Sequence, residues 1–226
     1  MVNRKYDEVK YVNEENSRIK TSHSRICGIS REYDTRSLQA LSAKDVNTLK
    51  EIINVDESKA NEFDLRMDEA CIQTIAQYQP RARDLRTIIM ILKMSNDLER
   101  LGDGAVHICR DALYLIDRPS FKPIPLLNHL AQESLGMLHD SIDAFINNDA
   151  ESAQEICKRD DVVDDLRDKI IAEMTLLMSK QPATVPIALR VMDISRKLER
   201  AADLSTNICE DIIFIVQGRV IKHGKN

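Results

Sequence analysis

Residues 98–111 read LERLGDGAVHICRD, and residues 198–211 read LERAADLSTNICED. Each residue of the second stretch lies one hundred positions after its counterpart in the first. Seven of the fourteen positions are identical: Leu98/Leu198, Glu99/Glu199, Arg100/Arg200, Asp103/Asp203, Ile108/Ile208, Cys109/Cys209 and Asp111/Asp211. A repeat that keeps its register in this way indicates that the chain consists of two related halves.

The apolar residues around the first copy predict a long helix that is buried on two sides. One stripe consists of Leu85, Ile88, Leu92, Val106, Cys109, Leu113 and Ile116, and a second of Ile91, Met94, Leu98, Leu101, Ala105, Ile108, Ala112 and Leu115. A helix with two apolar stripes packs between two partners. No useful length of the chain alternates apolar and polar residues, so no sheet is expected.

Prolines divide the predicted helices. The segment RPSFKPIP (118–125) cannot continue a helix and separates a first domain, 1–117, from a second, 118–226. Further breaks lie around Pro80 and Pro182, and Asp45 and Asp149 are expected to be N-caps. The predicted helices are 12–42, 45–79, 82–117, 124–147, 149–180 and 185–217. The expected fold is therefore all-α, with two tandem antiparallel three-helix bundles related by the internal repeat.

Composition limits the classes of partner and compartment. The chain has 226 residues and a formal net charge of -5, without a basic block, so nucleic acid is not an expected partner. Five cysteines, an odd number, favour small buried thiols in a reducing compartment over a disulfide framework. The polar N-terminal segment lacks the apolar stretch of an export signal. A cytoplasmic protein is expected.

Acidic residues recur in pairs spaced by four. Asp64 and Asp68 precede Glu99 and Asp103 in the first half, and the second half repeats both pairs as Asp164 with Asp168 and Glu199 with Asp203. Like charges at this spacing share one side of a helix and repel each other. A bound cation relieves the repulsion, and carboxylate oxygens suit Mg²⁺, Mn²⁺, Ca²⁺ or iron and admit Zn²⁺. The repeated acids are thus hypothesised to be metal ligands.

Other interpretations of these polar residues stay open. The acids could form a solvated helix face, or Arg100 and Arg200 could neutralise Asp103 and Asp203. His107 is interpreted as a surface histidine because Asn207 replaces it in the second half. Asp111 and Asp211 are interpreted as residues of the outer shell around the metal site or as residues that solvate the helix C-terminus. No nucleophile or phosphate-loop motif occurs, so an enzyme is not expected. The alternative function is that of a carboxylate-bridged multinuclear metalloenzyme.

Two long segments resemble one known family. DEACIQTIAQYQPRARDLRTIIMILKMSNDLERLGD (68–103) and RKLERAADLSTNICEDIIFIVQGRVIKH (196–223) are similar to the two halves of PhoU-family proteins. The resemblance runs from about Gly28 to His223; residues 1–27 show little of the family pattern. It implies tandem three-helix bundles, each with a multinuclear cluster of iron, zinc, manganese or magnesium. The implied ligands are Asp64, Asp68, Glu99, Asp103, Asp164, Asp168, Glu199 and Asp203.

The same resemblance implies a regulatory function. PhoU-like proteins are associated with the high-affinity phosphate ABC transporter and with a membrane sensor histidine kinase. This chain would then negatively regulate the phosphate-starvation response from the cytoplasm, peripherally at the membrane through its protein partners, and the relatives suggest a homodimer. One departure is Ala201-Ala202 before Asp203, where the family usually has glycine before the aspartate. Alanine keeps the helix, so the implied ligand is retained.

Overall fold

The computed structural model describes residues 35–41, 43–118 and 124–218, except for the side chains of residues 55–66, 96, 98 and 99. This part of the chain consists of helices and short connections, and it contains no strand. The predicted all-α class is confirmed. The first predicted helix, 12–42, falls largely outside the described residues, and its described end, 35–41, is helical.

The first half contributes two long helices, α2 (Val46–Tyr78) and α3 (Arg83–Ile116). Asp45 is the N-cap of α2, as predicted: its carboxylate accepts hydrogen bonds from the backbone N–H groups of Asn47 and Thr48, at 3.1 and 3.2 Å. Helix α2 ends where Gln79 turns into the left-handed region, with φ 45°, directly before Pro80. The proline therefore forces a tight connection, and α2 and α3 pack side by side.

The second half contains α4 (Pro125–Asn147), α5 (Ala150–Cys157), α6 (Asp160–Lys180) and α7 (Val185–Gln217), with a short 3₁₀ turn at Pro182–Thr184. Asp149 is the N-cap of α5, as predicted, and accepts hydrogen bonds from the backbone of Glu151 and Ser152 at 3.1 and 3.0 Å. The prediction of one continuous helix over 149–180 was wrong. The chain breaks between Cys157 and Asp160.

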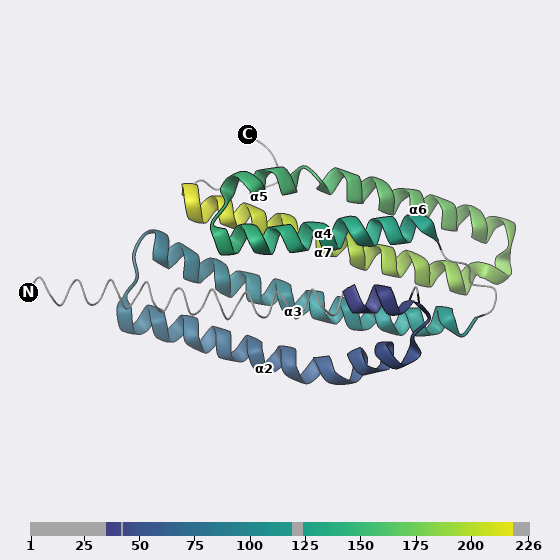
Figure 1. The fold of residues 1–226 in the computed structure, drawn as a ribbon, viewed down its shortest axis with the longest axis horizontal. Helices are drawn as coiled ribbons and strands as arrows, with labels where there is room; N and C mark the ends of the chain where they lie inside the picture. Colours follow the sequence, from purple (N-terminus) through teal and green to yellow (C-terminus); the bar gives the residue numbers. More distant parts are fainter. Residues whose placement is uncertain (1–34, 42, 119–123, 219–226) are drawn as a thin grey trace, which may run out of the picture.

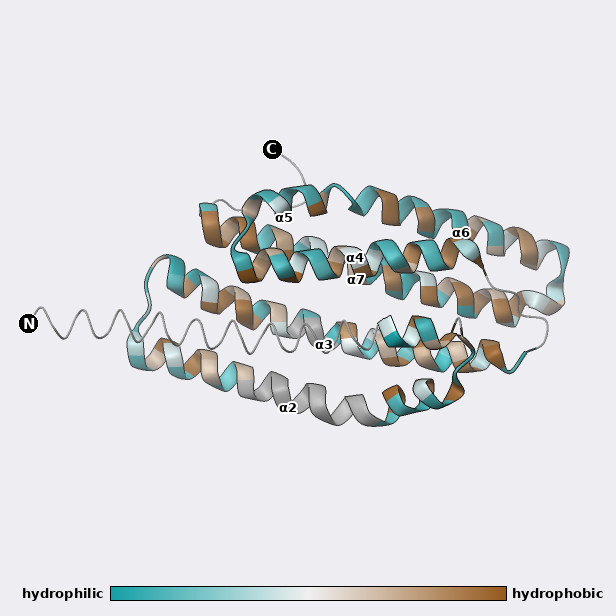
Figure 2. Cartoon of the chain, in the orientation of Figure 1, coloured by the Kyte–Doolittle hydropathy of each residue, from teal (hydrophilic) through white to brown (hydrophobic). Residues whose placement is uncertain are grey.

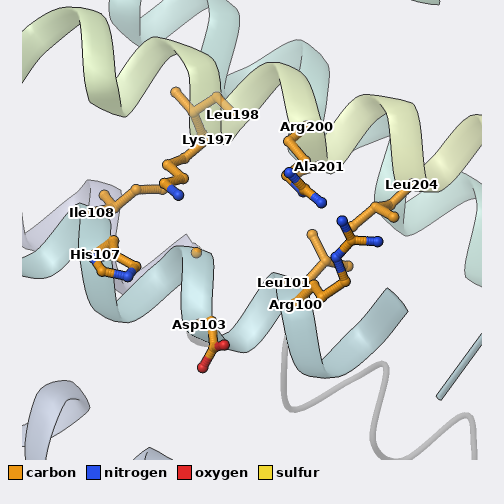
Figure 3. Close-up of a pocket in the computed structure, with 11 residues that line it drawn as sticks. Arg100, Leu101, Asp103, His107, Ile108, Lys197, Leu198, Arg200, Ala201 and Leu204 are labelled. Atoms are coloured by element: carbon orange, nitrogen blue, oxygen red, sulfur yellow. The ribbon is translucent and has the colours of Figure 1, made fainter. Parts of the chain in front are cut away.

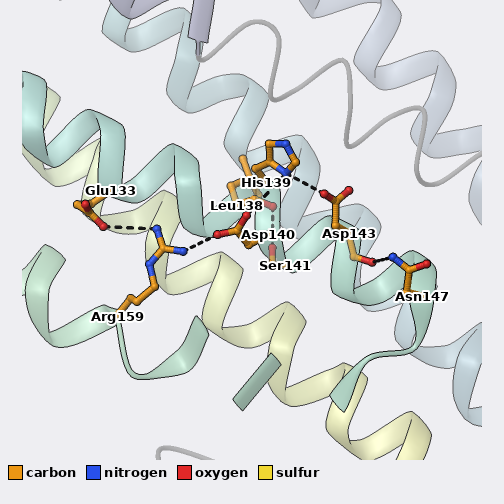
Figure 4. Close-up of polar contacts among 8 residues, drawn as sticks. All are labelled: Glu133, Leu138, His139, Asp140, Ser141, Asp143, Asn147 and Arg159. Carbon is orange, nitrogen blue, oxygen red and sulfur yellow. Dashed lines mark hydrogen bonds and ion pairs between the residues drawn. The ribbon is translucent and has the colours of Figure 1, made fainter. Parts of the chain in front are cut away.

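Contacts with α4 accompany this break. The N–H groups of Lys158 and Arg159 donate to carbonyls only three residues back, which tightens the turn. The Arg159 guanidinium extends to α4, where it lies 2.5 Å from Asp140 Oδ2 and 3.4 Å from Glu133 Oε2 (Figure 4). A Cβ at Gly136 of α4 would lie 2.9 Å from the guanidinium, so the glycine gives it room. This tertiary contact has no signature in helical periodicity.

Helices α3 and α7 pack against each other and form the contact between the two halves. They lie next to each other in Figure 1, with α2 beside α3 and with α4, α5 and α6 packed on α7. Helix α3 is thus wedged between two partners, as its two apolar stripes predict. Figure 2 shows hydrophobic and hydrophilic residues interspersed along these helices, as in amphipathic helices that share a core. Ile91 and Ile108 of α3 and Val191 and Ile208 of α7 belong to one continuous core. No helix in the described ranges has the length and apolar character needed to cross a bilayer.

The cysteines follow the predicted pattern with one difference. Cys71, Cys109 and Cys209 are buried and all carry free thiols. Cys157 is only half-buried, because it lies at the end of α5, and its thiol is hydrogen-bonded with that of Cys209 on α7. Burial raises the pKa of Cys71 to about 12, and the charge of Asp68 adds to the effect. A buried thiol of this kind is unreactive near neutral pH.

Candidate metal centre

The acids of the second half gather along the seam between α6 and α7. Asp160, Asp164 and Asp168 follow one another at four-residue spacing, so they share one side of α6. Glu199 and Asp203 lie on the facing side of α7, which runs antiparallel to α6 after the short turn at Pro182–Thr184. The seam opens into a surface hollow lined in part by Asp168, Glu199 and Asp203.

An arginine occupies the middle of this acidic seam. Arg167 Nη1 lies 2.9 Å from Asp164 Oδ1, and Nη2 lies 3.0 Å from Asp168 Oδ1. Arg167 also donates a short hydrogen bond to Glu199 across the seam. Burial lowers the pKa of Arg167, but the surrounding carboxylates outweigh this effect and hold it above its usual value. The guanidinium therefore supplies the positive charge that the four-residue spacing requires.

The surroundings of two carboxylates at the seam raise their pKa above the usual value for aspartate. The pKa of Asp203 is raised by burial and by the negative charges of Glu199 and Asp164, and Arg167 offsets part of the rise. The pKa of Asp160 is raised by burial and by the charges of Asp203 and Asp164. Asp160 was not among the predicted site residues. The signal for it was present, since Asp160 extends the row of Asp164 and Asp168 by one helical turn.

The first half is described in part. Asp68 on α2 is half-buried, and Asp103 on α3 is exposed, with its carboxylate directed away from α7 in Figure 3. The side chains of Asp64 and Glu99 lie outside the described part of the structure, although both residues belong to helices. Residue 67, one hundred positions before Arg167, is the buried Met67. The two halves therefore differ at the position of the central arginine.

The carboxylate oxygens at the seam suit a hard cation, but the Arg167 guanidinium competes with an ion for them. Carboxylate oxygens from two helices face one seam, as an ion of the Mg²⁺ or Mn²⁺ type requires. Among the side chains that the structure describes, no three of the His, Cys, Asp and Glu groups share a position that could hold one ion. In the second half, Asp164, Asp168 and Glu199 are instead arranged around Arg167. An ion at this seam requires the guanidinium to turn away.

Asp111 and Asp211 are buried between two helices, so the interpretation that they solvate a helix end was wrong. Each is only 6% exposed, because each lies in the contact between α3 and α7. Arg190 Nη1 of α7 lies 2.8 Å from Asp111 Oδ1 of α3, and Lys93 Nζ of α3 lies 2.9 Å from Asp211 Oδ1 of α7. The pKa of both aspartates is raised by burial and partly restored by these cations. The two residues connect the halves of the molecule.

His107 is exposed, in agreement with its interpretation as a surface residue. It lies on α3 one turn beyond Asp103 and lines a pocket between α3 and α7 rather than the seam of the acids. Arg100 and Arg200, which were considered as counter-charges for Asp103 and Asp203, line this pocket and also the hollow at the acidic seam. Arg100 approaches Asp97, with 4.0 Å between Nη1 and Oδ1, within its own helix.

Comparisons with known proteins agree with the repeat. A family model for the PhoU domain matches the chain twice, at residues 24–112 and 127–212. The phosphate-specific transport system accessory protein PhoU of Edwardsiella tarda is 33% identical over 205 residues, 91% of this chain and 84% of that protein. The protein of the same name from Escherichia coli is 32% identical over 211 residues, 93% of this chain and 87% of the relative.

Solved structures share the same arrangement of helices. The phosphate transport system regulatory protein PhoU from Streptococcus pneumoniae superposes with a TM-score of 0.87 at 28% identity, covering 94% of this chain and 100% of that one. PhoU from Pseudomonas aeruginosa gives a TM-score of 0.86 at 28% identity, with 92% and 99% covered. The similarity extends over both halves and over the packing between them.

Proposed function

The chain belongs to the PhoU family, and from this membership we propose that it is an accessory and regulatory protein of phosphate uptake. The observation that carries the proposal is the double match to the PhoU domain, together with about one-third identity to phosphate-transport accessory proteins over more than nine-tenths of the chain. The relatives are named as accessory or regulatory proteins, which supports a role in binding partners without catalysis.

In this role the protein links two membrane systems. Its helical surfaces bind the cytoplasmic subunits of the phosphate ABC transporter and a membrane sensor histidine kinase. When phosphate is plentiful, this link restrains the phosphate-starvation response. The protein acts in the cytoplasm, reaches the membrane through its partners and forms a homodimer.

Metal binding is a second part of the proposal. The ligands are Asp64, Asp68, Glu99 and Asp103 in one bundle and Asp164, Asp168, Glu199 and Asp203 in the other. Support comes from the antiparallel packing of α6 on α7, which brings acids of both helices to one seam. A multinuclear cluster of iron, zinc, manganese or magnesium in each bundle would neutralise them. In the second bundle the Arg167 guanidinium acts as the counter-charge when no ion is bound.

A capture experiment tests the regulatory part. The full chain, carrying an affinity tag, is expressed in phosphate-fed cells and recovered with detergent-solubilised membranes. We expect phosphate-transporter subunits and a sensor histidine kinase in the recovered material. Recovery of neither, beside a successful capture by a tagged close relative as a positive control, would contradict the adaptor function.

Elemental analysis tests the metal part separately. The protein is purified from metal-supplemented cells, and its metal content is compared with that of Glu99→Ala/Glu199→Ala and Asp164→Ala. Asp165→Ala is the matched control, since Asp165 is the exposed neighbour of Asp164 on the same helix. We expect ions in the wild type and in the control and a loss in the other variants. Less than one ion per wild-type chain would contradict metal binding and leave the adaptor function standing.

A further inference from the structure

The internal repeat brings its own copies face to face between α3 and α7. The pairs Lys93–Asp211 and Asp111–Arg190 show that the two helices run antiparallel, since the partner's number falls as the other rises. The midpoint of this contact lies at Gly102 of α3 and between Arg200 and Ala201 of α7, at the end of the repeated LER motif. A pocket at the midpoint is lined by residues of both copies, among them Arg100 and Leu101 of α3 and Arg200 and Ala201 of α7.

The pocket combines an apolar floor with a cationic rim. Its buried lining side chains are hydrophobic: Leu101, Ile108, Leu198, Ala201 and Leu204. Arg100, Lys197 and Arg200 provide the positive charges, and His107 lies at one end. In Figure 3 the guanidinium groups of Arg100 and Arg200 both extend into the space between α3 and α7. Two positive groups that converge in this way repel each other unless negative charge lies between them.

Arg100, Lys197 and Arg200 also line the neighbouring hollow that contains Glu199 and Asp203, but the described structure pairs them with few carboxylates. Arg100 approaches Asp97 of its own helix at the long distance of 4.0 Å between Nη1 and Oδ1. Within the described residues, neither Lys197 nor Arg200 forms an ion pair with a carboxylate. Asp103 also lines the pocket, but Figure 3 shows its carboxylate directed away from α7. The rim therefore carries an excess of positive charge.

Gly104 of α3 also lines the pocket. It lies inside α3, where glycine costs the helix about 1 kcal/mol relative to alanine. A Cβ added to Gly104 would meet nothing within 4 Å, so close packing within the protein does not require a glycine there. Its counterpart in the second half is Leu204, a packed residue of the same pocket. The open space at Gly104 leaves room for a ligand beside the α3 backbone.

We propose that this pocket binds a tetrahedral oxyanion, either inorganic phosphate or the phosphate group of an ester. Arginine guanidinium groups present paired N–H donors that match two oxygens of such a group, and the lysine adds a point charge. Arg100 comes from one half and Lys197 and Arg200 from the other, so a bound anion bridges the halves at their midpoint. The anion is held by cations and not by the proposed metal ligands, of which Asp103 alone lines this pocket, and its binding does not depend on the proposed partners.

Calorimetric titration of the full chain tests the proposal. The protein is first treated with a chelator and then titrated with inorganic phosphate at low and at physiological ionic strength. We expect saturable binding by the wild type and a loss of about tenfold or more in Arg100→Gln/Arg200→Gln, because charge-assisted hydrogen bonds to the anion are removed. Arg110→Gln is the matched control, since Arg110 is exposed on α3 and lies outside the pocket. It should bind phosphate as the wild type does.

A second variant separates the pocket from general stability. Gly104→Leu introduces the residue of the other repeat, which should raise the melting temperature through its helix propensity while blocking the anion. A parallel titration with AMP distinguishes the sources: tighter binding of AMP indicates a phosphate ester, and tighter binding of phosphate indicates the free ion. Absence of saturable binding of both, or wild-type affinity in the double variant, would overturn the proposal. So would undiminished phosphate affinity in Gly104→Leu.

Discussion

The carboxylate of Asp211 on α7 accepts two hydrogen bonds from the Lys93 ammonium of α3, at 2.9 and 3.0 Å. The reciprocal contact joins Arg190 of α7 to Asp111 of α3 at 2.8 Å. Each half thus supplies one buried carboxylate and one cation to the other. The two contacts lie on either side of the midpoint of the α3–α7 packing, so they fix how the halves are aligned.

The first prediction concerns these contacts. Lys93→Met and Arg190→Met should each lower the free energy of unfolding by about 1–3 kcal/mol, because a mostly buried carboxylate loses its partner. Urea denaturation at pH 7 measures the change. Arg196→Met is the control, since its pair with Asp193 is exposed and local to α7. It should change stability by less than about 0.5 kcal/mol. An equal loss of unfolding free energy in all three variants would show that the contacts between the halves stabilise the protein no more than an exposed ion pair does.

The second prediction concerns pH. Burial raises the pKa of Asp211 above its unfolded value, and Lys93 offsets part of that rise. In Lys93→Met the pKa of Asp211 rises further, so ionised Asp211 becomes more costly in the folded state. When the pH falls below the folded pKa, Asp211 is protonated and its partner matters less. Denaturation series from pH 7 to about pH 4 should therefore show the cost of Lys93→Met shrinking with acid. A cost that grows with acid would contradict this assignment.

The third prediction concerns Asp203. Its pKa is raised by burial and by Glu199 and Asp164, so the ionised form destabilises the folded chain at neutral pH. A raised folded pKa contributes stability below the unfolded pKa, and this contribution is lost as the pH rises through the folded pKa. Asp203→Asn should therefore stabilise the chelator-treated protein at pH 7. The gain should be less than about 1 kcal/mol, because Asp203 is only partly withdrawn from solvent and water screens its charge.

A bound metal ion should reverse the sign of the stability change caused by Asp203→Asn. With a saturating divalent cation the wild type gains stability through binding, and Asp203→Asn should gain less because it lacks a ligand. Thermal denaturation of both proteins, with chelator and with Mn²⁺, compares the four conditions. A variant that is more stable than the wild type under both conditions would argue against Asp203 as a ligand.

The fourth prediction concerns the central arginine. Arg167→Met copies the residue at the matching position of the first half, Met67. Without the guanidinium, the acids of α6 and α7 repel each other, so the chelator-treated protein should lose about 1–3 kcal/mol. Removal of the competing positive charge should also raise the Mn²⁺ affinity of the second bundle. Titration calorimetry measures this change against Arg110→Met as a control. An unchanged affinity would show that the ion and Arg167 do not compete.

Much of this architecture could be predicted from sequence. Helical periodicity, proline positions and N-cap residues are local signals, and they placed α2, α3, α4 and α7 within one or two residues of their observed ends. The repeat predicted that equivalent helices occur twice, and the two apolar stripes predicted that α3 packs between two partners. The break at Lys158 was missed, since Arg159 contacts residues of α4 and helical periodicity does not encode such contacts.

The gathering of acids in the second half was predicted in part. The acids were identified by their spacing, and Asp160 could have been added by the same rule. Arg167 was also within reach, because it stands three residues after Asp164. The division at residues 117 and 118 and the assignment of the acids as metal ligands stay predictions.

The sequence by itself determined the helices, their duplication and the sides on which their charges lie, because these follow from local spacing and composition. Tertiary structure alone decided which charges meet. Antiparallel packing of α3 on α7 turned Asp111 and Asp211 from apparent surface residues into buried contacts, and it gathered Arg100 and Arg200 in one pocket. Periodicity specifies the side on which a residue lies, whereas the packing of a second helix determines what that side faces.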